Sequence, residues 1–154
     1  MRKLASYIIP VLVCFLVGFF SGQIQMDSIQ NWYPLLNKPI LTPPNWVFPI
    51  AWSVIYFIVG ISAGALLNMR QTGKKVFILM WSAQLFLNFL WSIAFFYFRS
   101  PLAGLFDILC LDIVVICFII KSYSVRKVAS FLFIPYLIWI LFATYLNGYI
   151  FLYN

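Results

Sequence analysis

Long apolar segments alternate with short polar ones along the whole chain. Each apolar segment comes close to, or exceeds, the roughly 20 residues with which a helix crosses the hydrocarbon core of a bilayer. We therefore predict five transmembrane helices, at about residues 4–24, 46–67, 76–98, 101–120 and 128–152. The fold class expected is an all-α integral membrane protein, a five-transmembrane-helix bundle that forms a single membrane domain over residues 1–154.

The connection between the first two helices, residues 27–45, is the most unusual stretch. Residues 32–56 hold five of the eight prolines and three of the six tryptophans. Proline fixes φ, lacks an N–H donor and biases the preceding residue away from helix, so the connection should be stiff. We interpret it as a lid loop over a cavity, with Asn45 as the N-cap of the next helix.

The first apolar segment has a second interpretation. Arg2 and Lys3 before an apolar run also suit a secretory signal peptide. The run extends to Phe20 without a small-x-small cleavage site before a soluble mature protein, which favours an uncleaved helix. Gly18 and Gly22 form a G-x-x-x-G pair, for which we expect close helix packing inside one bundle rather than a dimer seam.

Composition and charge add a class and an orientation. Hydrophobic residues make up 65% of the chain and charged residues 8%, against about a quarter charged in soluble domains. In a five-helix arrangement, eight of the ten Lys and Arg residues lie on the side of the N-terminus, and only Lys38 and Arg99 lie on the other. This positive-inside pattern predicts a cytoplasmic N-terminus and an external lid and C-terminus. We expect the membrane to be the cell (plasma) membrane of a bacterium. The same pattern explains the net charge of +7, so we expect lipid and no nucleic acid as a partner.

The residue types that are missing exclude several kinds of chemistry. The chain has no histidine and no glutamate, which excludes His-based metal sites, Ser-His triads and His-ligated haem. We expect no metal site and no required cofactor. Asp112 is predicted near the membrane centre, where an acid is either functional or a hydrogen-bonded link between two helices. The link is the interpretation that we favour, because no Lys or Arg is predicted at that depth.

Polar and aromatic stripes mark the inward faces of three helices. Gln84, Asn88 and Ser92 recur at i, i+4 and i+8 on the third helix, and Trp91 flanks them. Such side chains either hydrogen-bond between helices or line a cavity. A further stripe on the second helix comprises Trp52 and Tyr56, and one on the fifth helix comprises Trp139, Ala143 and Leu146. Three such stripes beneath a stiff aromatic loop indicate a pocket for a flat, apolar ligand with a few polar edges.

These residues fall within three motifs that resemble a known family. The motifs are W-Y-P-x-L-x-K-P followed by P-P-x-W-x-F-P-x-x-W (residues 32–52), Q-L-x-L-N-x-x-W-S (84–92) and P-Y-L-x-W-x-x-F-A-x-x-L-N (135–147). Together they resemble the tryptophan-rich sensory protein and translocator protein family, also called the peripheral-type benzodiazepine receptor family. The resemblance covers essentially the whole chain and implies a five-helix bundle, often a homodimer, that binds porphyrins such as protoporphyrin IX and haem.

The resemblance also implies a set of pocket residues and a function. The family pocket would comprise Tyr33, Pro43, Trp52, Tyr56, Asn88, Ser92, Trp139, Ala143 and Leu146. Members are reported to promote light-dependent breakdown of porphyrins, and here Trp52 and Trp139 would be the indoles that carry such chemistry. The alternative function is transport of tetrapyrroles or other hydrophobic small molecules across the membrane. The basic residue of the animal cholesterol motif is absent after Tyr145, which argues against cholesterol as a ligand.

The charge pattern makes a prediction about topology. Reporter fusions at Asn154 and near Gly73 should report opposite compartments, because five spans place the C-terminus opposite the second loop. Paired alkaline phosphatase and fluorescent-protein fusions measure this directly. A cytoplasmic signal from both sites would contradict the number of spans.

Overall fold

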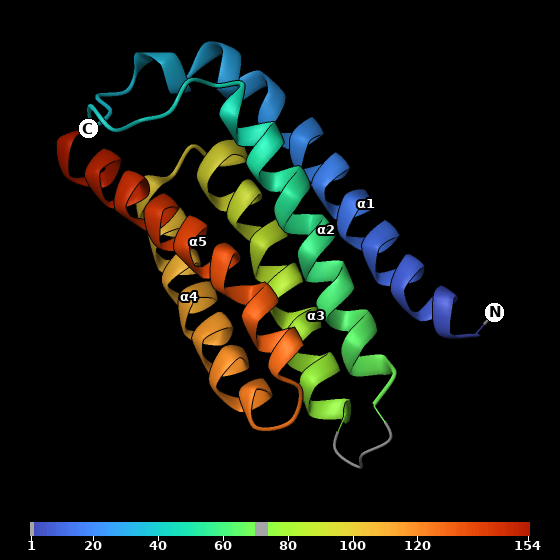
Figure 1. Cartoon of the computed structure of the whole chain (residues 1–154). Coiled ribbons are helices and arrows are strands. Elements are labelled where there is room, and N and C mark those ends of the chain that lie inside the picture. The colour runs from blue at the N-terminus through green and yellow to red at the C-terminus, as the bar shows by residue number, and fades with distance from the viewer. Residues whose placement is uncertain (1, 70–73) are drawn as a thin grey trace.

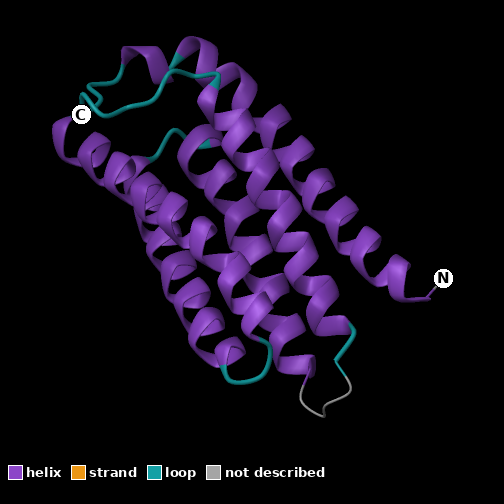
Figure 2. Cartoon of the chain, in the orientation of Figure 1, coloured by secondary structure: helices purple, strands orange, loops and turns teal. Residues whose placement is uncertain are grey.

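The computed structural model describes residues 2–69 and 74–154, and five of its helices are long and apolar enough to cross a membrane. They are α1 (Arg2–Asn31), α2 (Val47–Leu67), α3 (Lys74–Trp91), α4 (Pro101–Tyr123) and α5 (Lys127–Tyr153). No strand occurs within the described ranges, and loops join the helices only at the two ends of the bundle (Figure 2). The prediction of an all-α membrane bundle is confirmed. Arg70 and Gly73, which entered the topology prediction, lie outside the described residues.

Successive helices run in opposite directions, so the bundle has two distinct ends. One end carries the α1–α2 connection, the α3–α4 turn and the C-terminus, while the N-terminus lies at the far end (Figure 1). Helix α1 packs mainly against α2, and α5 packs against α4 and α2. The residues of the predicted stripes on α2 and α5 lie in the half of the bundle nearer the α1–α2 connection.

Helix α1 extends further than its apolar pattern predicts. It continues to Asn31, so the lid predicted at residues 27–45 begins too early, and the non-helical connection is residues 32–46. The extension is polar, and it is held by hydrogen bonds and an ion pair that hydropathy does not encode. We use lid for residues 32–46, which contain one short 3₁₀ turn, η1 (Tyr33–Leu35).

The starts of α2 and α4 differ in how they are capped. Asn45 was expected to cap α2, but the helix begins at Val47 after Trp46, and no side chain caps it. Ser100 caps α4 as its type and the following Pro101 suggest, because its hydroxyl accepts the backbone N–H of Ala103 at 3.3 Å.

The third predicted helix is two structures rather than one. An α-helix ends at Trp91, and a π-helix, η2 (Ser92–Tyr97), follows where the hydropathy pattern predicts a continuous α-helix to residue 98. Its wider turns bring the Phe98 N–H to the Ile93 carbonyl at 2.9 Å. Arg99 then takes a left-handed conformation with φ 50°, which ends the helix and turns the chain into α4. Ser92 and Phe96 of this π-helix both form hydrogen bonds with α1.

The half of the bundle away from the lid is a packed core. Leu66, Phe118 and Phe133 are completely buried there, and the rings of Phe118 and Phe133 stack with centroids 4.0 Å apart. Asp112 links α4 to α5, as expected, through the Thr144 hydroxyl at 2.8 Å. The same hydroxyl lies 2.9 Å from the Ile140 carbonyl. The Thr144 hydroxyl is thus shared between the Asp112 carboxyl group on α4 and the backbone of its own helix.

Small residues bring α1 and α2 into close contact. A Cβ added at Gly60 would lie 2.6 Å from the Val11 Cα, and one at Gly64 would overlap the Tyr7 ring. Gly18 faces the Tyr56 ring in the same way. Gly22 differs from the expected packing role, because nothing lies within 4 Å of its Cβ position. Only the first glycine of the G-x-x-x-G pair therefore supports packing, and the second leaves open space.

The difference between these glycines is testable. Gly60→Ala should lower the free energy of unfolding by about 1–3 kcal/mol, because α1 must move away from α2. Gly22→Ala is the matched control, and it should be neutral or stabilising by up to about 1 kcal/mol through helix propensity. Reversible unfolding in mixed micelles measures both. Equal stability of the two variants would contradict the close contact.

Candidate functional site

A cavity of about 540 Å³ lies beneath the lid. Its walls come from α1, the lid, α2, α3 with η2, and α5. On α2 the lining ends at Tyr56, and on α5 it begins at Trp139, so the cavity occupies only the lid-side half of the bundle. Its size is within the range of about 300–1,000 Å³ that is usual for small-molecule sites.

One wall is an aromatic cluster from α2 and α5. Trp52 stacks on Tyr56 with ring centroids 5.6 Å apart and an interplanar angle of 28°. Trp139 stands perpendicular to Trp52, at 6.4 Å and 89°, and Phe48 packs edge-on against Trp139 at 5.9 Å. The spacing of four residues between Trp52 and Tyr56 puts both rings on one helix face. The cluster offers large π surfaces in fixed orientations.

A second aromatic wall comes from α3, η2 and the lid. Trp91 stacks on Phe95 at 5.3 Å and 14°, and Phe96 stands edge-on to both. Tyr33 of the lid packs on Phe96 with centroids 5.9 Å apart. Trp91, Phe95 and Phe96 can cluster in this way because the π-turn begins directly after Trp91. The cavity is thus lined by aromatic groups from both sides.

Hydrogen bonds hold the lid in place over the cavity. The Lys38 ammonium donates to the carbonyls of Tyr33, Pro34 and Leu36, at 2.7, 3.3 and 3.1 Å, and lies over the Tyr33 ring. Burial lowers the pKa of Lys38 and raises the pKa of Tyr33 to about 12, so the phenol stays neutral at physiological pH. At the far edge of the lid, Asn37 exchanges hydrogen bonds of 2.8 and 3.1 Å with the Asn154 side chain. The lid is therefore tied both to itself and to the end of α5.

Six polar side chains around the cavity are hydrogen-bonded to one another in three pairs. The Tyr56 hydroxyl donates to Asn88 Oδ1 at 2.9 Å, and Trp91 Nε1 donates to Asn147 Oδ1 at 3.1 Å. Gln25 Nε2 on α1 donates to the Ser92 hydroxyl at 2.7 Å. These groups fix the wall positions, and both interpretations of the polar stripe hold together: it bonds between helices and it faces the cavity.

The predicted site residues divide into two groups. Those that line the cavity are Tyr33, Trp52, Tyr56, Asn88, Trp91, Ser92, Trp139, Ala143 and Leu146. Two others do not line it: Gln84 is buried in the packed half at 1% exposure, and Pro43 lies in the lid away from the lining. Gln84 falls outside because the helix carries it a full turn further from the lid than Asn88. A ligand role for the lining residues stays a prediction.

Helix α1 contributes a cavity wall that was not predicted from the sequence. Its lining face includes Gly18, Ser21, Gly22 and Gln25, together with Met26 and Ile29. The signal was present, since small or polar residues recur at i, i+3, i+4 and i+7 on an otherwise apolar helix. The G-x-x-x-G interpretation assigned Gly18 and Gly22 to helix packing, so the cavity wall on this face of α1 was not predicted.

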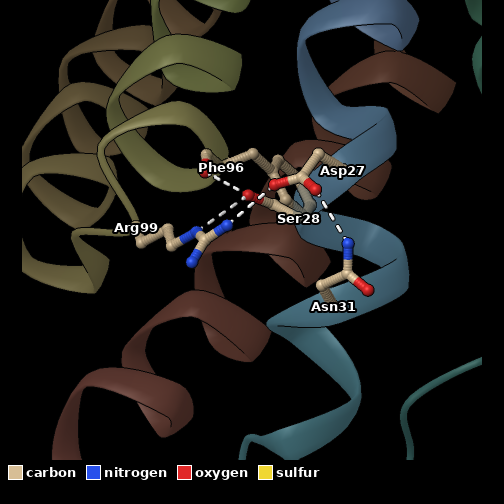
Figure 3. Close-up of polar contacts among 5 residues, drawn as sticks. All are labelled: Asp27, Ser28, Asn31, Phe96 and Arg99. Atoms are coloured by element: carbon tan, nitrogen blue, oxygen red, sulfur yellow. Dashed lines mark hydrogen bonds and ion pairs between the residues drawn. The ribbon is translucent and has the colours of Figure 1, made fainter.

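The lid end of α1 is fastened to the α3–α4 turn (Figure 3). The buried Ser28 hydroxyl donates to the Phe96 carbonyl at 2.6 Å. Beside it, Arg99 pairs with Asp27 at 2.7 Å, and Asp27 also accepts from Asn31 at 2.8 Å. These contacts hold α1 as a wall of the cavity.

Comparisons with known proteins agree with the motifs. The model of the TspO/MBR family matches residues 10–153. The chain is 44% identical to a protein named tryptophan-rich protein TspO from Archaeoglobus fulgidus, over 99% of this chain and 97% of that one. It is 33% identical to another of that name from Chlorobaculum tepidum, with 95% and 94% covered. It is also 32% identical to the translocator protein of Homo sapiens, over 90% of this chain and 81% of that one.

The contacts of Ser28 and Asp27 should contribute unequally to the stability of the fold. Ser28→Ala should cost about 1–2 kcal/mol of unfolding free energy, because it leaves the buried Phe96 carbonyl without its donor. Asp27→Asn should cost less than about 1 kcal/mol, since the ion pair is exposed, with side chains 70% and 47% accessible. Unfolding in mixed micelles compares the two variants. A larger cost for Asp27→Asn would contradict the assignment of the main contact to Ser28.

Proposed function

The chain belongs to the TspO/MBR family of membrane proteins, and we propose that it is a receptor whose cavity binds porphyrins such as protoporphyrin IX and haem. The observation that carries the proposal is the pair of aromatic walls around a cavity of about 540 Å³. Flat, apolar rings gain both buried area and stacking between such walls. In this proposal porphyrin is the ligand, and the protein requires no further cofactor.

The extent of the cavity favours a receptor over the alternative, a transporter. Transport requires a site that opens in turn to both sides of the membrane. Here the lining stops at Tyr56 and Asn88, and the half beyond is packed around Phe118 and Phe133. The packed half therefore supports retention of a ligand rather than its passage across the membrane.

We extend the proposal to light-dependent breakdown of bound porphyrin. An excited porphyrin transfers an electron or generates reactive oxygen, and an indole next to it is the most oxidisable side chain available. The rings of Trp52 and Trp139 lie at the cavity wall with their centroids 6.4 Å apart. Since the chain has no histidine and no glutamate, conventional acid–base or metal chemistry has few candidate groups.

We also propose an orientation, a membrane and an oligomeric state for the receptor. The charge asymmetry of the sequence supports a cytoplasmic N-terminus and an external lid. The five apolar helices, together with the bacterial and archaeal origin of relatives, support residence in a cell membrane. We include a homodimer on the basis of the family resemblance.

A porphyrin titration with and without illumination tests this proposal. Trp52→Phe and Trp139→Phe should retain much of the binding of protoporphyrin IX, because phenylalanine still stacks. Both should slow light-driven bleaching at equal occupancy, because the oxidisable indole is lost. Tryptophan fluorescence quenching measures binding, and the Soret absorbance measures bleaching.

Trp46→Phe is the matched control, since Trp46 is 68% exposed and lies outside the cavity lining. It should change neither quantity. Bleaching at the wild-type rate in both cavity variants would remove the tryptophans from the mechanism. Absence of saturable porphyrin binding to the wild-type protein would overturn the receptor proposal itself.

A further inference from the structure

The outer surface of the lid is apolar. The large side chains exposed on it are those of Leu35, Ile40, Leu41 and Trp46, at 80%, 103%, 67% and 68%. The single charged side chain of the lid, Lys38, folds back, and its ammonium donates to three carbonyls of the lid itself. Connections that lie in water are usually built from charged or small polar residues, so an exposed apolar surface of this kind indicates an interaction site.

Two of these side chains project from a tight turn, residues 39–42, which we call the lid tip. The Thr42 N–H donates to the Pro39 carbonyl at 2.9 Å, and the Thr42 hydroxyl donates to the same carbonyl at 2.7 Å. Pro39 is buried, so the base of the turn is anchored in the protein while Ile40 and Leu41 are exposed at its centre. In water the central positions of a turn usually hold Gly, Asn, Asp or Ser. Two neighbouring aliphatic residues there are suited to an apolar environment instead.

The backbone around the lid tip has few groups that need water. Pro39, Pro43 and Pro44 have no N–H, and the Thr42 N–H is bonded within the turn. Among residues 39–44, this leaves the N–H groups of Ile40 and Leu41. Unpaired backbone groups are costly in the hydrocarbon core, where there is no water, whereas the headgroup region is hydrated. The tip is therefore suited to the boundary between headgroups and acyl chains.

Hydrogen bonds to α5 fix the position of the tip. The Asn37 N–H donates to Asn154 Oδ1 at 2.8 Å, and Asn37 Nδ2 donates to the Tyr153 carbonyl at 3.1 Å. The lid passes beside the C-terminus before it returns to α2 (Figure 1). Three residues lead from Asn37 to Ile40, and such a segment spans at most about 10 Å. The tip thus lies close to the end of a helix that is long and apolar enough to cross the membrane.

Exposed aromatic side chains mark the membrane interface at this end of the bundle. Trp46 precedes α2, Tyr97 and Phe98 lie at the end of η2, and Tyr153 ends α5. Tryptophan and tyrosine are enriched where a membrane protein passes from hydrocarbon to headgroups. Since Asn37 is bonded to the backbone of Tyr153, the lid tip lies near the level of this aromatic belt.

We propose that Ile40 and Leu41 insert into the lipid leaflet on the lid side, so that the lid tip anchors the lid to the bilayer. The occupant of this surface is lipid because the exposed apolar surface of α5 continues to Leu152 and Tyr153, next to the atoms that hold Asn37. The bilayer that surrounds α5 therefore extends to the tip. Opening of the lid then requires both side chains to leave the lipid. The anchor goes beyond the proposed function, since it does not depend on which ligand the cavity holds.

Spin labelling of the full-length protein in lipid nanodiscs tests the anchor. Ile40→Cys and Leu41→Cys are each labelled with a nitroxide in a Cys110→Ala, Cys117→Ala background, while Cys14 is completely buried and is left in place. Power saturation measures collisions of the label with molecular oxygen, which concentrates in lipid, and with a water-soluble nickel chelate. Both labels should be at least about threefold less accessible to the chelate than a label in water, because a polar solute is excluded from hydrocarbon. Their accessibility to oxygen should be at least as high.

Two further labels calibrate the measurement. Ser124→Cys reports water, because Ser124 is exposed in the polar α4–α5 connection, and Ile113→Cys reports lipid, because Ile113 is 62% exposed in the middle of α4. Labels at Ile40 and Leu41 that resemble the one at Ile113 would support the anchor. Accessibility to the chelate equal to that at Ser124 would place the tip in water and overturn the proposal. Protection from both reagents would mean that protein, such as a second copy of the chain, covers the tip, and it would overturn the proposal as well.

Discussion

The close contact of α1 with α2 is the constraint on which the site depends. In a bilayer, helices gain little from hydrophobic burial against one another, so association depends on close packing and on hydrogen bonds. Gly60 and Gly64 allow α1 to lie directly on α2 at the end remote from the lid. Nearer the lid, Gly22 has no neighbour, and the cavity takes the space. One helix therefore both closes the bundle and forms a cavity wall.

The walls are rigid because their polar atoms are used for structure. The bond from Ser28 to the Phe96 carbonyl and that from Gln25 to Ser92 join α1 to η2, and the bond from Tyr56 to Asn88 joins α2 to α3. The aromatic groups are thereby held apart around an open space instead of collapsing into it. What faces a ligand is therefore mainly the π surface of the two aromatic walls. In the proposed complex, stacking of the ligand on these walls supplies the affinity.

The fold could be predicted from the sequence more completely than the site. Apolar length determined the five helices, and Ser100 with Pro101 determined one helix start. The extension of α1 to Asn31 was not predicted, because it depends on the tertiary contacts of Asp27 and Ser28. The π-helix was not predicted either, because the hydropathy of a segment does not distinguish an α-turn from a π-turn. Residues spaced four apart predicted the walls from α2, α3 and α5. The wall from α1 was not predicted, because small residues such as Ser21 and Gly22 occur both where helices pack closely and where a cavity lies.

The most direct test of the central claim is a structure of the protein in lipid with protoporphyrin IX bound. We predict that the ring lies beneath the lid between the wall of Trp52 and Trp139 and the wall of Trp91 and Phe95, with its carboxylates directed out towards the lid. A porphyrin bound only on the lipid-facing surface, with the cavity unchanged, would contradict the account.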